Sequence, residues 1–304
     1  MKVKGPLLLL LAAMIWGVAF VAQSVGMDHV GPWTFLCVRS LIAGVSMLPV
    51  VAVLSRSGTA PKQAAEERRN SRKTLLTGGI CCGTVLGVAS ILQQIGLQYT
   101  SVGKAGFLTA CYILIVPLLG LLLGRRCGRL VWCGVAVALL GLYFLCFKDG
   151  SPLNFGDILV FISATMFSGH ILLIDHFIPL CNGVKMSCIQ FFVCGAVALL
   201  GMLVFEEPSL PQLLAAWKPL LYAGVLSSGV GYTIQIIGQR GMNPTVASLI
   251  MSLESVFAVL AGWLILHQHL SGREMLGCVL VFVSIVLAQL PEGKTKCAEH
   301  AQAE

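Results

Sequence analysis

Residues 6–26 read PLLLLLAAMIWGVAFVAQSVG, and this run contains no charged side chain. A helix needs about 20 mostly apolar residues to cross a hydrocarbon core that is about 30 Å thick. The run also exceeds the ~7–15 apolar residues of a cleaved signal peptide. We therefore expect residues 6–26 to be retained as a transmembrane helix.

Similar apolar runs recur along the whole chain of 304 residues, of which 57% are hydrophobic and 11% charged. The mean hydropathy is +0.89. A soluble domain must cover itself with polar groups, and this chain has too few of them. Solid apolar runs, rather than short alternating ones, favour helices over a β-barrel. The predicted fold class is an all-α integral membrane protein whose ten transmembrane helices span residues 6–26, 33–54, 75–97, 102–123, 130–147, 155–177, 185–205, 213–238, 244–266 and 273–290.

The basic residues predict how the chain is oriented in the membrane. If the N-terminus is cytoplasmic, fifteen of the 20 Lys and Arg residues lie inside, and only Lys104, Lys148, Lys218 and Arg273 lie outside. Short cytoplasmic loops are enriched in Lys and Arg, so both termini are expected in the cytoplasm and the protein in the plasma membrane. The net charge of +7 follows this topology, and no nucleic-acid binding is predicted.

Neither a metal site nor a cofactor is predicted. The twelve cysteines are scattered without a CxxC pair or ligand-like spacing, as expected of small apolar residues in helices. His267 and His269 have no third ligand nearby in the sequence. The expected partners are the lipid bilayer and a small-molecule substrate. The sequence leaves the oligomeric state open, and a homo-oligomer is compatible with it.

The chain carries a weak internal repeat. Gln93-Gln-Ile-Gly96 matches Gln235-Ile-Ile-Gly238 at an offset of 142 residues, and earlier in each half the offset is 151. The ordered matches predict two repeats of five helices, residues 1–150 and 151–290, followed by a cytoplasmic tail at 291–304. Further matched pairs are Ala105 with Ala247, Gly120 with Gly262, Leu122 with Leu264, Ala13 with Ala164, Trp16 with Phe167 and Arg39 with Gln190.

An odd number of spans per repeat has a topological consequence. A five-helix unit ends on the side opposite to its start, so its second copy inserts upside down. Inverted repeats of this kind are typical of secondary transporters that alternate between two similar states around a central site. The sequence therefore predicts transport.

Residues 92–109, LQQIGLQYTSVGKAGFLT, resemble the third-to-fourth-helix signature of EamA-type members of the drug/metabolite transporter superfamily. Trp16-Gly17, Phe35, Arg39 and residues 247–257 are similar to that family as well. The resemblance implies a ten-helix carrier in which helices one to four and six to nine enclose a central cavity, with helices five and ten outside. It also implies substrates such as amino acids, amines, sugars, nucleosides or organic anions.

Gln93 and Gln235 are candidate substrate-binding residues because they occupy matching places in the two repeats. An amide both donates and accepts hydrogen bonds, which suits a polar substrate of little net charge. Tyr232 lies one turn from Gln235 and is a further candidate. Alternatively, each glutamine bridges neighbouring helices. A stripe of mostly small residues shares the face of Gln235, namely Gly224, Ser228, Gly231 and Gly238, and its repeat mates are Cys82, Leu86, Ala89 and Gly96.

Helix one places Trp16, Phe20 and Gln23 on one face. An aromatic wall with a polar tip suits the stacking of a ring or the binding of a cation. Trp16 and Gln23 are therefore candidate substrate-binding residues. The alternative is that the aromatic face packs against neighbouring helices.

Glu254 and His170 are the candidates for proton coupling. Glu254 lies near the middle of helix nine, where a charged side chain costs ~2.5–3.5 kcal/mol and is expected to face the bundle interior or water. Its repeat mate is Tyr112, whose hydroxyl is expected to face it and to contribute to the substrate site. Alternatively, Glu254 pairs statically with Arg39 or Lys104. His170 is a candidate because histidine changes charge near neutral pH, although a packing role is the alternative.

Lys104 is flanked by small residues that leave it room to turn inward and bind a carboxylate or phosphate. Its alternative is a position at the membrane interface, to which a long basic side chain extends its charge. Arg39 is interpreted as a structural anchor that pairs with Asp28.

The function predicted from these features is secondary active transport, with export preferred, of a small polar, amino-acid-like or drug-like metabolite by alternating access. The alternatives are an intramembrane enzyme and a membrane sensor or scaffold. An intramembrane enzyme needs paired Asp, a Ser–His pair or a His/Glu metal set, and none has suitable spacing, so no enzymatic activity is predicted. A sensor normally carries a large soluble domain. A primary pump is excluded for this chain alone because it lacks a Walker-type loop.

Overall fold

The computed structural model describes residues 4–56, 65–100, 102–124, 128–146, 154–265 and 271–289. The tail after residue 290, the pair His267 and His269, and the connection between the two halves around Asp149 lie outside the described residues. Within them every regular element is a helix. The elements are α1 (Lys4–Met27), α2 (Pro32–Arg56), α3 (Ala65–Leu97), α4 (Val102–Ala110), α5 (Tyr112–Leu122), α6 (Arg129–Cys146), α7 (Phe155–Phe177), α8 (Gly183–Phe205), α9 (Leu210–Ala215), α10 (Trp217–Leu221), the π-helix η1 (Tyr222–Gly231), α11 (Tyr232–Gln239), α12 (Pro244–Met251), α13 (Leu253–Ile265) and α14 (Gly272–Gln289).

Eight candidate membrane spans in the described residues are long and apolar enough to cross a bilayer. Two shorter apolar helices, Arg129–Phe144 and Met275–Ala288, fall where the fifth and tenth spans are predicted. The all-helical, multi-pass class is thus confirmed, whereas the count of ten spans stays a prediction. The eight candidates are Lys4–Met27, Pro32–Val53, Arg72–Leu97, Lys104–Leu122, Phe155–Phe177, Gly183–Phe205, Trp217–Gln239 and Pro244–Ile265.

Several helix ends follow from local sequence. The Asn154 side chain accepts a hydrogen bond from the backbone N–H of Asp157, and the Asp157 carboxylate accepts one from the Asn154 backbone N–H, which forms a capping box. Asn243 caps α12, with Pro244 as the first helical residue. Before it, Gly241 turns the chain with a φ of 72°, a conformation that favours glycine.

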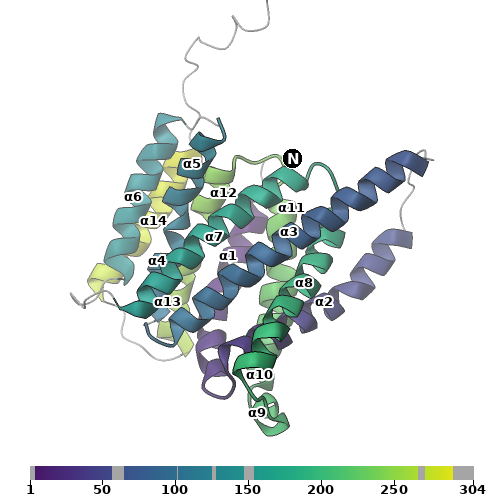
Figure 1. Cartoon of the computed structure of the whole chain (residues 1–304). Helices are drawn as coiled ribbons and strands as arrows, with labels where there is room; N and C mark the ends of the chain where they lie inside the picture. The colour runs from purple at the N-terminus through teal and green to yellow at the C-terminus, as the bar shows by residue number, and fades with distance from the viewer. Residues whose placement is uncertain are drawn as a thin grey trace, which may run out of the picture.

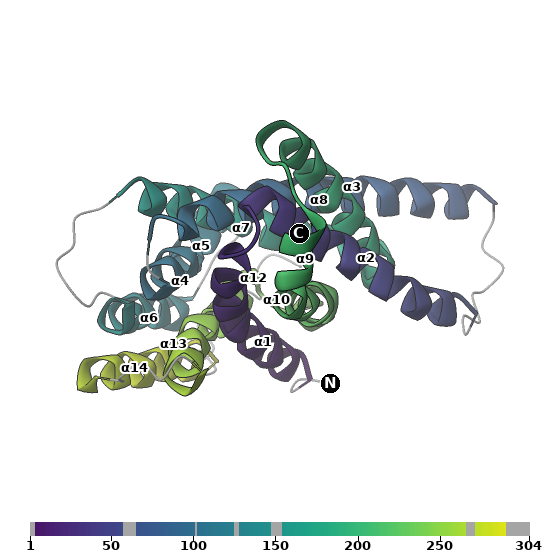
Figure 2. The ribbon, with the colours of Figure 1, turned by 90° about the horizontal axis from the view of Figure 1, so that it is seen from below.

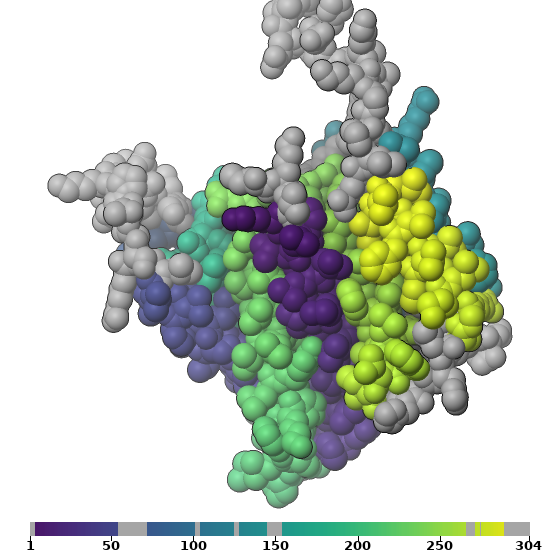
Figure 3. Space-filling view, turned by 180° about the vertical axis from the view of Figure 1, so that it is seen from behind, coloured from purple at the N-terminus to yellow at the C-terminus, as the bar shows by residue number. Residues whose placement is uncertain are grey.

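The helices form a bundle whose centre is made by helices of both halves (Figures 1 and 2). α6 and α14 pack along each other at one side, and α2 and α8 pack together at the other. α3 packs against α7 and α8, whereas α1 packs against α13, η1 and α11. Figure 3 shows α1 between the α10–α11 span and α13 on the rear face.

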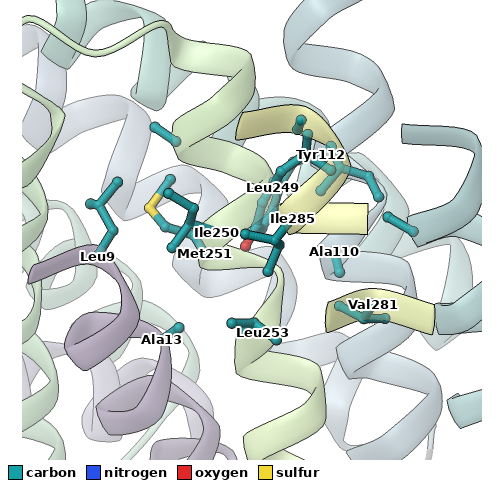
Figure 4. Packing of buried hydrophobic residues seen from close by; sticks show 14 of the residues in the cluster. Leu9, Ala13, Ala110, Tyr112, Leu249, Ile250, Met251, Leu253, Val281 and Ile285 are labelled. Carbon is teal, nitrogen blue, oxygen red and sulfur yellow. The ribbon is translucent and has the colours of Figure 1, made fainter. Parts of the chain in front are cut away.

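The largest apolar cluster lies where α1, α5, the α12–α13 span and α14 meet, with Leu9, Tyr112, Leu249 and Ile285 among its members (Figure 4). Large apolar side chains also point outward, such as Leu200 at 68% and Val204 at 73% exposure. Such surfaces are costly in water and suit a hydrocarbon solvent.

Three spans predicted as single helices are interrupted. The fourth breaks at Cys111 between α4 and α5, and the ninth breaks at Ser252 between α12 and α13. The eighth contains η1, a π-helix rich in Gly and Ser. Neither Cys111 nor Ser252 is a helix breaker, so local sequence gave no signal. π-Helical segments and mid-span breaks are frequent at functional sites.

The start of α2 is capped by a carboxylate from the other half of the chain. Glu206, which follows α8, accepts hydrogen bonds from the backbone N–H of Trp33 at 2.9 Å and of Thr34 at 2.8 Å, and from the Thr34 hydroxyl at 2.6 Å. We expect Glu206→Ala to lower the free energy of unfolding by about 1–2 kcal/mol, as loss of a helix cap does. Thermal melting in detergent measures this effect. The neighbouring exposed Glu207 provides the control Glu207→Ala, and equal melting of both variants would contradict the capping role.

Candidate functional site: a central cavity

A cavity lies at the centre of the bundle, with about 560 Å³ of space between atoms, part of it continuous with solvent. Helices from both halves of the chain contribute to its wall. The lining residues of the first half are Trp16, Ala19, Phe20, Gln23, Arg39, Gln93, Thr109 and Tyr112, and those of the second half are Phe167, His170, Ile171, Ser227, Tyr232, Gln235, Met251 and Glu254.

Most lining residues are related in pairs by the two offsets found in the sequence. Gln93 and Gln235 form one pair at 142 residues, and Tyr112 and Glu254 form another. The exceptions are Gln23, Arg39, Ser227 and Tyr232, whose repeat mates are not in the wall. The remaining pairs are Thr109 with Met251 at 142, and Trp16 with Phe167, Ala19 with His170 and Phe20 with Ile171 at 151.

The polar residues of two repeat-related pairs differ in their contacts. The Tyr112 hydroxyl donates a hydrogen bond of 3.0 Å to Oε1 of Glu254, so the two repeat mates face each other as the sequence predicts. Glu254 is only 6% exposed. The amide of Gln93 donates to the hydroxyl of Thr109 at 2.9 Å, whereas Oε1 of Gln235 is buried without a partner. A buried polar atom without a partner is costly, which is typical of a site completed by water or a ligand.

Tyr232 is the centre of an aromatic group at the cavity. Its ring lies 4.7 Å from the ring of Trp16, 5.6 Å from that of Phe191 and 5.9 Å from that of His170. The indole N–H of Trp16 donates to the carbonyl of Ser227 in η1 at 3.1 Å. These rings offer π faces to a solute that has an apolar or aromatic body.

Arg39 also lines the cavity. The sequence predicts instead that Arg39 is a structural anchor paired with Asp28. Its Nη1 donates a hydrogen bond of 2.8 Å to Oε1 of Gln23, and the amide of Gln23 in turn donates to the carbonyl of Ala19. The guanidinium carbon lies 5.9 Å from the centre of the Phe35 ring.

Lys104 lies apart from the cavity wall. Its ammonium is 2.6 Å from Oδ2 of Asp157, and Oδ1 of Asp157 accepts from the Thr100 hydroxyl at 2.6 Å. Asp157 is 1% exposed. The pair joins α4 of the first half to α7 of the second, so we no longer include Lys104 among the candidate substrate-binding residues.

The structure brings the other predicted site residues to one place: Trp16, Gln23, Gln93, Tyr112, His170, Tyr232, Gln235 and Glu254 all line the cavity. Gln94 does not, and both of its amide atoms are buried without a partner. Sequence reasoning missed Thr109 and Ser227, and it misread Arg39. The signal for Arg39 was its charge within a span, which marks a functional residue by default. The residues that the structure describes contain no group of acids, histidines and cysteines able to hold a metal.

The sequence profile of the EamA-like transporter family matches residues 3–147 and, a second time, residues 154–290. The protein belongs to the EamA-like transporter family. This confirms the resemblance of residues 92–109 and, with the apolar helices, makes the protein a multi-pass membrane transporter in its general class.

Individual relatives agree with this assignment. An uncharacterized transporter of Archaeoglobus fulgidus is 28% identical over 289 residues, which cover 93% of this chain and 84% of the relative. The uncharacterized inner membrane transporter YedA of Escherichia coli is 24% identical, with 91% of this chain and 88% of YedA covered. The uncharacterized transporter YoaV of Bacillus subtilis is 23% identical, with 94% and 96% covered. One solved crystal structure shares the fold with a TM-score of 0.74 at 18% identity, over 94% of this chain and 96% of that chain.

Proposed function

We propose that this EamA-family protein is a secondary carrier that moves a small polar solute through the central cavity by alternating access. The observation that carries the proposal is the wall of the cavity, to which the two halves contribute repeat-related residues such as Gln93 with Gln235 and Tyr112 with Glu254. Carriers built from two similar halves hold their solute at the interface between the halves, which opens toward each side of the membrane in turn. The proposed direction is export, in line with the sequence prediction.

We infer further that the halves are inverted five-helix repeats, and two helix crossings support this. A Cβ atom added at Gly96 would lie 2.8 Å from the carbonyl of Gly156, and one added at Gly238 would lie 3.1 Å from the carbonyl of Gly5. The two crossings are related by the offsets of 142 and 151, and each joins the C-terminal end of one helix to the N-terminal end of another. Such reciprocal contacts are expected where two repeats are related by a twofold axis.

Helix packing and helix breaks support the same inference. α3 packs on α7 and α8 as the η1–α11 span packs on α1 and α2, and the α4–α5 span packs on α7 as the α12–α13 span packs on α1. The α4–α5 break directly precedes Tyr112, and the α12–α13 break comes two residues before its mate Glu254. Interrupted helices beside a central site are a known feature of carriers.

The test is transport by the purified protein in liposomes, screened with radiolabelled amino acids, amines, sugars, nucleosides and organic anions, with and without a pH gradient. Moving none of them faster than empty liposomes would contradict the proposal. Vesicles of known protein orientation distinguish export from import.

For a solute that is transported, Gln93→Ala and Gln235→Ala are each expected to raise the solute concentration at half-maximal rate about ten-fold. Each substitution removes a hydrogen-bonding amide from the cavity wall. Initial rates over a range of solute concentrations measure this. The matched control is Gln94→Ala, which changes the neighbouring glutamine that does not line the cavity. An equal effect of all three substitutions would remove the two amides from the proposed site.

A further inference from the structure

The cavity holds a cation that the repeat symmetry does not explain. Arg39 is 6% exposed and lines the cavity, whereas its repeat mate Gln190 is neutral and is not in the wall. In the pairs Gln93 with Gln235 and Tyr112 with Glu254, each half supplies one residue to the wall. Arg39 has no such counterpart, so its positive charge comes from the first half alone.

No carboxylate neutralises Arg39 within the described part of the chain. Among the described residues, neither Glu254 nor Asp28 is found within 4.0 Å of the guanidinium as an ion-pair partner. The hydrogen bond from Arg39 goes to Gln23, which is neutral, and Nε of Arg39 is buried without a partner. Arginine cannot relieve this by losing its proton, and an unpaired buried charge is strongly unfavourable.

The surroundings fix the guanidinium in place. The amide of Gln23 is oriented by its own hydrogen bond to the Ala19 carbonyl, and the Phe35 ring lies beside the guanidinium. Arg39 is seven residues from the start of α2, about 10 Å along the helix axis, and its 6% exposure places it inside the bundle. A fixed guanidinium is the preferred partner of a carboxylate, which it binds with two parallel hydrogen bonds.

We propose that Arg39 binds the carboxylate of the transported solute, and that the solute is a small organic acid whose apolar or aromatic body lies against Trp16 and Tyr232. This inference rests on the proposed function and specifies the substrate class of the same cavity. The carboxylate supplies the missing counter-charge, and the rings of Trp16 and Tyr232, 4.7 Å apart, supply the apolar surface.

The experiment uses two probes of nearly equal shape, phenylacetate and its neutral amide phenylacetamide. Melting of the full-length protein in detergent is followed as each probe is added. Phenylacetate is expected to raise the melting temperature saturably, and to do so at concentrations roughly 10- to 100-fold lower than phenylacetamide. Arg39→Gln is expected to abolish the difference, and Arg39→Lys to retain part of it. Arg240→Gln, which changes an exposed arginine, is the control and is expected to behave as the wild type.

The inference would be overturned by equal effects of the two probes on the wild type, by no effect of either probe, or by a difference that persists in Arg39→Gln. If Arg39→Gln does not fold, the wild type and Arg39→Lys still decide. Chloride or inorganic phosphate that protects as well as phenylacetate would indicate a general anion site and contradict the carboxylate assignment. Transport of organic acids that is unchanged in Arg39→Gln would leave the proposed function standing and refute the role of Arg39. Binding of phenylacetate through Arg39 without transport of any solute would support the carboxylate site and refute the proposed function.

Discussion

Glu254→Gln is expected to abolish solute accumulation driven by a pH gradient, while exchange of solute without a gradient continues at a rate close to that of the wild type. Glutamine keeps the shape of the side chain and still accepts the hydrogen bond from Tyr112, but it cannot take up or release a proton. Glu254 is 6% exposed, lines the cavity and lies at mid-span, where a carboxylate is costly and proton uptake removes the cost. A group that changes charge inside the solute pathway is suited to couple the movement of the solute to the movement of a proton.

The measurement compares accumulation in liposomes with an imposed pH gradient to exchange of labelled for unlabelled solute in its absence. A loss of at least about ten-fold in accumulation, with less than a two-fold change in exchange, is the expected pattern. Glu207→Gln, an exposed acid outside the cavity, is the control. Accumulation that survives intact in Glu254→Gln would exclude Glu254 as the proton carrier and leave His170 as the remaining candidate.

Tyr112 distinguishes proton coupling from a purely structural role of Glu254. Tyr112→Phe removes the hydrogen bond of 3.0 Å to Glu254 but leaves the carboxyl able to titrate. If Glu254 carries the proton, accumulation in Tyr112→Phe persists with a shifted pH dependence. If Glu254 only anchors Tyr112, Tyr112→Phe impairs exchange and accumulation alike, whereas Glu254→Gln, which keeps the hydrogen bond, changes neither.

Much of this fold could be predicted from the sequence because a bilayer leaves few alternatives. Backbone groups in lipid must be paired within a segment, so each long apolar run becomes a helix. The predicted small-residue face of Gly224, Ser228, Gly231, Gln235 and Gly238 is buried throughout, and so are its repeat mates. Within α3, Gly79 and Gly83 lie against Ile189 and Gln190 of α8.

The helix breaks and the true neighbours of the charged residues could not be predicted in the same way. Nothing in the local sequence distinguishes Cys111 or Ser252 from the residues beside them, since the breaks depend on packing between spans. The pairing of Lys104 with Asp157 depends on how α4 meets α7, and the sequence does not report that contact. The sequence predicts that Arg39 is a structural anchor paired with Asp28, but the packing of α2 in the bundle places Arg39 at the cavity.

The crossing of α1 and α13 gives the largest expected effect on stability, because a single methyl group is enough to disturb it. A Cβ atom added at Gly17 would lie 2.4 Å from Cβ of Phe257 and 2.7 Å from the backbone nitrogen of Ala258. Because backbone atoms are part of the clash, no side-chain rotation relieves it and the helices must separate. Gly17→Ala is therefore expected to cost about 2–3 kcal/mol of unfolding free energy, the upper range for overpacking, although alanine favours helix.

Gly169→Ala is the matched control, since Gly169 also lies within a membrane-spanning helix and a Cβ atom there would meet nothing within 4 Å. The same substitution is expected there to be neutral or to stabilise by up to about 1 kcal/mol. Unfolding in detergent measures both variants. Because α1 carries Trp16 and α13 carries Glu254, the separation of these helices also widens the cavity, so Gly17→Ala is expected to impair transport even where it folds. Equal stability of the two variants would mean that α1 and α13 do not cross as closely in the membrane as they do in this structure.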